Sequence, residues 1–390
     1  MRSTSEIRRA YRGPVLFSHG FRIFFLSAGL WAALAMLLWV ALLTRGGILP
    51  SRFDPVSWHI HEMLFGYAMA VLAGFLLTAV PNWTGRLPVV GWPTVTLAGL
   101  WLIGRLAALI SGALPLWLAD LAELVFPLAL VSVLAREIIA GKNWRNLKVL
   151  VAVSVFGLAD VLFLAETLHG VELGGIGLRL GVAAIIWLIT LIGGRVVPSF
   201  TRNWLVRQGA GALPIPFGRG DLAVLAFQTV VFALWVVWPD LLALPPLAAL
   251  AGLAHLWRLW RWRGWRGRAE PLVWILHVAY LFVPIGFFEL SLRQFGDFST
   301  VPHGWTAGAV ALMTLAMMTR ASLGHSGRML AAGRGLTLVY VAVILAALAR
   351  VASEYVGNPM PFLDLAATFW VLGFGGFAVL FWPILSRPRR

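Results

Sequence analysis

Apolar segments of about 20 residues recur along the whole chain, and they constrain the fold more than any single motif does. The 390-residue sequence is 60% hydrophobic and only 12% charged, and no stretch reads as a separate soluble domain. Each segment must satisfy its own backbone polar groups in hydrocarbon, and the short alternating strands of a membrane barrel are missing from the sequence. The sequence therefore predicts an all-α, polytopic membrane helix bundle.

About twelve membrane-crossing helices are expected. The connection 198–220, which is rich in Pro, Gly and Arg, separates two sets of six spans, so we expect one membrane domain, 1–390, with candidate halves 1–197 and 221–390. His61 precedes Gly66 by five residues, and His303 likewise precedes Gly308 by five. This similarity is either a chance match or the trace of an internal duplication. The predicted spans are 22–43, 58–80, 92–111, 114–135, 147–169, 178–197, 221–238, 241–260, 271–292, 303–320, 335–356 and 361–383.

Positive charge is distributed unevenly between the predicted loops. Lys and Arg gather in both terminal tails and in alternate loops, whereas the opposite loops carry only Arg45, Arg52 and Arg293. Because loops that face the cytoplasm are enriched in Lys and Arg, both termini are predicted to be cytoplasmic. The net charge of +15 then reflects topology and contact with anionic lipid of the bilayer, and no nucleic-acid partner is expected.

Three ionisable side chains stand at the mouth of the second span. His59, His61 and Glu62 lie within four positions, and ionisable groups are costly in hydrocarbon, so this stretch is the first candidate for a functional site. The chain has no cysteine, which excludes thiolate ligands, iron–sulfur clusters and covalently attached haem. A metal would have to use His, Met, carboxylate or carbonyl groups, and neutral imidazole binds iron and copper well.

The two histidines of this stretch point in different directions on an ideal helix, about 200° apart. His59 shares a face with Glu62 and Met63, which would complete a copper site or orient the imidazole. His61 would face another helix, with His303 as the opposite axial ligand of a haem. The alternatives are that His59 anchors the helix at the interface and that Glu62 is a proton-relay carboxylate or a salt-bridge partner.

Two arginines lie inside predicted spans. Arg105 and Arg350 both fall in the outer half of the membrane, where a guanidinium needs a partner, and haem propionates would accept its hydrogen bonds. The alternative is pairing with a protein carboxylate at similar depth, for which the candidates are Asp120, Glu123, Glu289 and Glu354.

A second group of histidines is expected near the cytoplasmic face. His19, His277 and His325 would form a second metal or haem site there, or remain solvated interfacial residues. His255 is expected at the interface, and Asp160 in the fifth span is a candidate step of a proton path or a helix-pairing residue.

Four motifs carry a resemblance to a known family. They are 19–26 (HGFRIFFL), 58–66 (WHIHEMLFG), 74–85 (GFLLTAVPNWTG) and 318–328 (MTRASLGHSGR). With these motifs the sequence resembles the NnrS family of bacterial multi-spanning proteins that contain haem and copper. The likeness runs over almost the whole chain, and Ile23 stands where the family pattern has a proline.

The resemblance implies a role in nitric oxide metabolism, in denitrification or protection from nitrosative stress, at the bacterial inner membrane. It implies non-covalent b-type haem and copper as cofactors. It favours an oxidoreductase that reduces or detoxifies nitric oxide near the periplasmic face. Glu62 would then have a catalytic role, and the electron donor would be a quinol or a periplasmic protein. The alternatives are a haem-based sensor without turnover and a membrane transporter. The histidines that match the family motifs, and are thereby implied as metal ligands, are His19, His59, His61, His277, His303 and His325.

Overall fold

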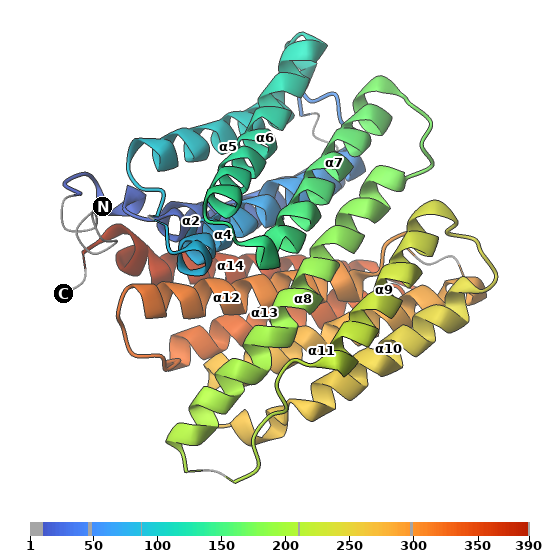
Figure 1. The fold of residues 1–390 in the computed structure, drawn as a ribbon. Helices are drawn as coiled ribbons and strands as arrows, with labels where there is room; N and C mark the ends of the chain where they lie inside the picture. The colour runs from blue at the N-terminus through green and yellow to red at the C-terminus, as the bar shows by residue number, and fades with distance from the viewer. Residues whose placement is uncertain (1–10, 46–48, 87, 210, 297–298, 389–390) are drawn as a thin grey trace. The chain divides into compact units, whose positions relative to one another are not determined.

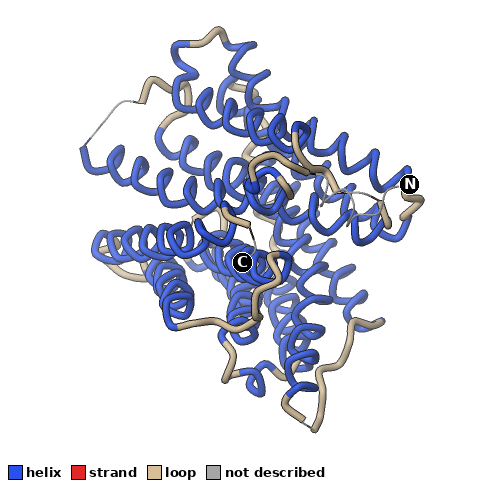
Figure 2. The backbone as a smooth tube through the Cα atoms, turned by 90° about the vertical axis from the view of Figure 1, so that its left-hand side faces the viewer, coloured by secondary structure: helices blue, strands red, loops and turns tan. Residues whose placement is uncertain are grey.

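The structure, a computed structural model, describes residues 11–45, 49–86, 88–209, 211–296 and 299–388. Within these ranges every regular element is a helix (Figures 1 and 2), so the all-α prediction is confirmed. The tails 1–10 and 389–390, whose arginines enter the orientation argument, lie outside the described residues. The cytoplasmic placement of both termini stays a prediction.

Eleven of the described helices are long and apolar enough to cross a membrane. The remaining predicted span, 241–260, corresponds to the 18-residue helix α10. The prediction of about twelve membrane helices is therefore confirmed. Apart from short 3-10 turns, the chain begins with α2 (Gly20–Arg45), α3 (Pro55–His61), η2 (Glu62–Tyr67), α4 (Ala68–Thr84), α5 (Trp92–Ile110), α6 (Leu116–Ala140) and α7 (Leu147–His169). The others are α8 (Ile176–Arg207), α9 (Arg219–Val237), α10 (Leu244–Arg261), α11 (Pro271–Leu292), η7 (Gly304–Val310), α12 (Ala311–His325), α13 (Arg334–Ala352) and α14 (Met360–Ser386).

The chain forms two compact units. Unit 1 comprises residues 1–181, 317–329 and 374–390, and unit 2 comprises 182–316 and 330–373. The division into consecutive halves stays a prediction. The expected connection at 198–220 is helical as far as Arg207, because α8 continues through Pro198. A proline removes one backbone hydrogen bond from a helix, which membrane helices tolerate when neighbouring groups satisfy the carbonyl that is set free.

In unit 1 the second span is built from three consecutive pieces, α3, η2 and α4. Asp54 begins α3, because its side chain accepts hydrogen bonds from the backbone N–H groups of Val56 and Ser57. Directly after His61 the backbone widens into a π-helical turn, η2, before α4 resumes α-helical geometry. Such turns are rare and are frequent at functional sites. The indole N–H of Trp101 donates to the carbonyl of Gly66 over 3.0 Å, which joins α5 to this wide turn.

In unit 2 a buried polar chain joins α9, α10 and α11. Asp221 accepts hydrogen bonds from Arg258 over 2.9 Å and from Arg261 over 3.1 Å. Arg258 also donates to the Tyr280 hydroxyl over 2.6 Å, and that hydroxyl lies 2.8 Å from Nδ1 of His255. His255 is fully buried in unit 2, and its expected place at the membrane interface stays a prediction. The Tyr280 hydroxyl gives the buried ring a polar partner inside this group of helices.

Candidate metal centre

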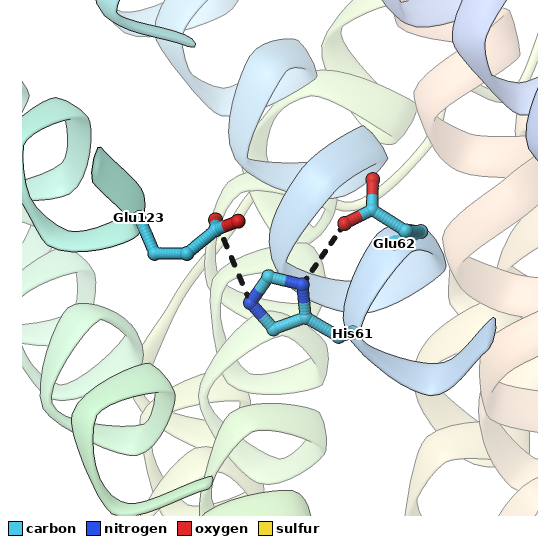
Figure 3. Close-up of side chains that lie close together, drawn as sticks. All are labelled: His61, Glu62 and Glu123. Carbon is cyan, nitrogen blue, oxygen red and sulfur yellow. Dashed lines mark hydrogen bonds and ion pairs between the residues drawn. The ribbon is translucent and has the colours of Figure 1, made fainter. Parts of the chain in front are cut away.

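The second span places His61 inside a buried group of charged side chains in unit 1. Nδ1 of its ring lies 3.0 Å from Glu62 Oε1, and Nε2 lies 3.2 Å from Asp160 Oδ1 and 3.9 Å from Glu123 Oε2. Figure 3 shows the ring between Glu62 and Glu123, with one carboxylate toward each nitrogen. Neither His61 nor Glu62 has any exposed surface. Three helical segments, α3 with η2, α6 and α7, therefore meet at one imidazole.

Arg105 of α5 is the counter-charge of this group. Its Nη1 donates to Glu62 Oε1 and its Nη2 to Glu123 Oε2, both over 2.6 Å, so the guanidinium bridges the two carboxylates. We call His61, Glu62, Arg105, Glu123 and Asp160 the His61 cluster. With a neutral imidazole the cluster holds three carboxylates against one guanidinium, a surplus of two negative charges. Buried charge without compensation costs several kcal/mol, on the order of the penalty for an isolated ion in a protein interior.

Several polar atoms of the His61 cluster have no hydrogen-bond partner among the described residues. They are His61 Nε2, Glu62 Oε2, Arg105 Nε, Glu123 Oε1 and Asp160 Oδ1, of which His61 Nε2 and Asp160 Oδ1 lie 3.2 Å from each other as an ion pair when the imidazole is protonated. Buried polar atoms are nearly always paired, and unpaired ones call for an explanation such as an ion. The unpaired atoms belong to side chains that converge on one imidazole, which is the arrangement expected around a bound cation.

Aromatic side chains enclose the imidazole. Phe53 stacks on the His61 ring at 5.0 Å between centroids, and Phe163 lies nearly parallel to it at 6.1 Å. Gly66 is required beside them, because a Cβ atom there would lie 2.6 Å from Arg105 Nη1. The rings limit rotation of the imidazole and exclude water, and a low dielectric strengthens each charge interaction inside the cluster.

The donor set fits a divalent metal ion. One ligand atom each from His61, Glu62 and Glu123 lie within 4.8 Å of one another. Imidazole suits iron, zinc, copper and nickel, whereas carboxylate suits harder ions such as manganese. This triad can therefore hold a metal of intermediate character, and the unpaired atoms of the cluster support the fit.

The two arginines expected to meet haem propionates pair with protein carboxylates, which is the alternative that the sequence left open. Arg105 binds Glu62 and Glu123, as described above. In unit 2, Arg350 Nη1 donates to Glu354 Oε1 over 3.2 Å, and its Nη2 lies 2.8 Å from Nε2 of His303. A propionate would have to displace these partners.

The outer histidines are engaged separately. His303 Nδ1 lies 2.5 Å from Glu354 Oε1, and the axial pairing of His303 with His61 stays a prediction, since each ring is hydrogen-bonded inside its own unit. The ring of His59 stacks on Trp39 at 4.6 Å between centroids. Glu62 Oε1 contacts His61 and Arg105, which is the salt-bridge role that the sequence left open. A copper site that combines His59 with Glu62 and Met63 stays a prediction.

The expected inner histidines fall into two places. His19 and His325 both lie against Phe21 in unit 1, at 5.7 and 5.6 Å between ring centroids. His277 belongs to unit 2 and lies 2.8 Å from the Thr201 hydroxyl. Since that hydroxyl donates to the carbonyl of Val197, His277 Nε2 is the donor to Thr201. A metal role for these three residues stays a prediction.

Sequence reasoning did not place Glu123 and Asp160 beside His61. Glu123 was expected only as a partner for an arginine and Asp160 only as part of a proton path or a helix pair. The available signal was that each is an isolated acid within an apolar span, since such residues usually face a partner or a cavity.

Comparison with known proteins identifies the family. The family model described as NnrS protein matches residues 15–389. No curated protein matches the chain. Because the matched region covers nearly the whole sequence and includes every residue of the His61 cluster, the chain belongs to the NnrS family.

Proposed function

We propose that the protein binds one redox-active metal ion, iron or copper, at the His61 cluster and uses it to reduce or detoxify nitric oxide. The observation that carries the proposal is that three buried carboxylates and only one guanidinium surround the buried imidazole, which leaves a surplus of negative charge. A divalent ion offsets that surplus and gives the unpaired imidazole and carboxylate atoms of the cluster a partner. Membership of the NnrS family supports nitric oxide as the substrate.

The two sides of the imidazole suggest different tasks. Nε2 faces Glu123 and Asp160. His61, Glu123 and an oxygen of Glu62 would hold the ion, with Asp160 beside them, because the ligand atoms of these three residues lie within 4.8 Å of one another. Glu62 accepts the Nδ1 proton of His61 and thereby fixes the tautomer, as carboxylates do beside metal-binding histidines. Its second oxygen, Oε2, has no described partner and is the atom at which the cluster can hold a proton.

Conversion of two nitric oxide molecules to nitrous oxide and water consumes two electrons and two protons. When bound, a reduced iron or copper ion would supply a binding site for nitric oxide and a source of electrons. A quinol or a periplasmic protein would provide those electrons. The protein contributes a fixed imidazole, a proton-holding carboxylate at Glu62 and aromatic walls at Phe53 and Phe163 that limit water. We assign no step to haem, because both His61 nitrogens and both terminal nitrogens of Arg105 already face carboxylates.

Metal content tests the proposal. Full-length protein purified in detergent without oxygen should bind about one iron or copper ion per chain at the His61 cluster. Asp160→Asn and Glu123→Gln should lower the affinity about 10- to 100-fold, the usual effect of changing groups around a metal. Glu137→Gln is the matched control, because Glu137 is a buried carboxylate of unit 1 that pairs with Arg86 and Arg136. Equal affinity in all four proteins would refute the metal centre.

Nitric oxide uptake then distinguishes the functional classes. Catalytic consumption of nitric oxide by the metal-loaded protein with a reductant supports the enzyme, and Glu62→Gln should slow this consumption more than it lowers metal content. Binding of one equivalent without turnover would indicate a sensor. Metal flux into proteoliposomes without nitric oxide binding would indicate a transporter.

A further inference from the structure

Protons have to reach the His61 cluster from solvent, since reduction of two nitric oxide molecules consumes two of them. The need for such a route rests on the proposed function. His61 and Glu62 have no exposed surface, and the rings of Phe53 and Phe163 cover the imidazole. Phenyl rings have neither a transferable hydrogen nor a lone pair, so they do not carry protons. A route into the cluster therefore has to follow polar side chains.

Polar side chains lead from the cluster to the exposed end of α6 and α7. His169, the last residue of α7, places its Nε2 atom 3.0 Å from Oδ2 of Asp120 on α6. These two side chains are 40% and 24% exposed, respectively. Glu123 lies about one turn further along α6 and its side chain is 1% exposed, whereas the His61 side chain is fully buried. Exposure thus falls step by step from His169 through Asp120 and Glu123 to His61.

Asp120 and Glu123 lie on one face of α6. Residues three apart on an α-helix are neighbours on its surface, with Cβ atoms about 5–6 Å apart. Asp120 Oδ1 and Glu123 Oε1 are both buried and have no hydrogen-bond partner among the described residues. The other oxygen of each carboxylate contacts His169 or Arg105. One water molecule can donate to both unpaired oxygens, and each oxygen keeps a second lone pair for another partner.

Other charged side chains at this end of unit 1 bind backbone groups. Glu166 accepts two backbone N–H groups, and Arg179 and Arg52 donate to backbone carbonyls. In the described part of the chain, the ion-pair partner of Asp120 is His169. Histidine is the side chain that most readily gains and loses a proton near neutral pH. The exposed member of this pair is therefore suited to take protons from water.

We propose that His169 and Asp120 are the proton entry of the His61 cluster. A proton from solvent binds Nδ1 of His169, and the imidazolium gives its Nε2 proton to Asp120 Oδ2. The Asp120 carboxyl group rotates and passes this proton through a bridging water to Glu123 Oε1, at the edge of the cluster. Asp120 is then a carboxylate again, and the exposed ring regains its Nε2 proton by exchange with solvent. Each passage moves one proton inward and returns both side chains to their starting state.

Hydrogen exchange at the His61 ring tests the entry without any catalytic activity. Full-length, metal-free protein with isotope-labelled histidine is transferred in detergent to deuterium oxide, and nuclear magnetic resonance follows the ring N–H signals of His61. A positioned acid or base contributes on the order of 100-fold or more to a proton transfer, and local opening of the helices offers a competing route. Asp120→Asn and His169→Ala should therefore slow the exchange at least about ten-fold.

Two comparisons assign the effect to the entry. Glu172→Gln is the matched control, because Glu172 is an exposed carboxylate just beyond His169, and this variant should exchange like wild type. Imidazole added to the buffer should restore the rate in His169→Ala, since a small base can occupy the space that the side chain leaves. Imidazole should not restore the rate in Asp120→Asn, which lacks the next acceptor.

The direction of the change separates an entry from a purely structural contact. Loss of the contact between His169 and Asp120 weakens the junction of α6 and α7, and a weaker junction opens more often and exchanges faster. Slower exchange therefore reports a lost proton route. Exchange that is unchanged or faster in either variant, with helicity by circular dichroism intact, overturns the proposal. If Asp120→Asn does not fold, His169→Ala and its rescue by imidazole decide the question in the same way.

Nitric oxide consumption shows whether the entry serves turnover. In the metal-loaded protein, both variants should consume nitric oxide at least about ten-fold more slowly, with unchanged metal affinity because neither residue belongs to the proposed ligands. Undiminished consumption by variants with slowed exchange would overturn the role of the entry in turnover. If wild type consumes no nitric oxide, the proposed function fails, and the exchange rates still decide whether His169 and Asp120 admit protons to the cluster.

Discussion

Replacement of Arg105 by methionine should destabilise unit 1 strongly. Arg105 is 4% exposed and holds Glu62 and Glu123 through two hydrogen bonds of 2.6 Å. Methionine keeps much of the side-chain volume but removes the only guanidinium of the His61 cluster, which leaves three buried carboxylates unopposed. Breaking a buried ion pair by removing one partner costs about 3–5 kcal/mol, and we expect a loss of free energy of unfolding in that range for the metal-free protein.

Metal should offset part of that loss. An ion that binds only the folded state at about 100 times its dissociation constant adds about 2.7 kcal/mol of stability. Since the arginine variant has one more uncompensated negative charge, it should gain at least as much as wild type from added Co²⁺. Glu62→Gln in the Arg105→Met background should recover part of the lost stability, because it removes one of the unopposed charges.

Equilibrium unfolding by sodium dodecyl sulfate in mixed micelles measures these differences, with the 20 tryptophans as the fluorescent probe. The matched comparison is Arg86→Met, since Arg86 is 40% exposed and its pair with Glu137 should contribute at most about 1 kcal/mol. If Arg105→Met costs no more than Arg86→Met, or if Glu62→Gln makes the double variant worse, the electrostatic account of the His61 cluster is wrong.

Three further predictions concern the surroundings of the cluster and unit 2. Gly66→Ala should lower the Co²⁺ affinity of the His61 cluster about ten-fold, because the alanine Cβ would lie 2.6 Å from Arg105 Nη1. Helicity should be unchanged. An affinity equal to that of wild type would show that the guanidinium is not confined. Asp54→Ala should cost about 0.5–2 kcal/mol as a lost helix cap. Burial raises the pKa of Asp54, but hydrogen bonds from the first turn of α3 outweigh it and hold the pKa below its ordinary value of 3.8. The cap contribution should therefore be complete above about pH 4 and disappear as the pH falls through the folded pKa, and a wild-type advantage that is the same at pH 3 and pH 7 would contradict this. Tyr280→Phe should cost about 1–3 kcal/mol in SDS unfolding, since Arg258 loses a buried acceptor, and a change below that range would mean that the guanidinium finds another partner.

The sequence by itself determined the membrane helices, since a segment in hydrocarbon must satisfy its backbone groups within itself. Twelve apolar spans were therefore predictable without tertiary information, as was the pairing of the arginines within the spans with some anion. The signal is local in each case, because length and hydropathy of one segment decide whether it crosses the bilayer, and one ionisable residue within it demands a partner.

Only the tertiary structure decided which partners meet. Glu123 and Asp160 come from α6 and α7, and their approach to His61 depends on how three helices are rotated about their axes. Glu62 was expected either beside a metal or in a salt bridge, and its ion pair with Arg105 depends on how α5 packs against the second span. Rotation and register arise from packing between segments distant in sequence, and packing is the information that a hydropathy pattern does not contain.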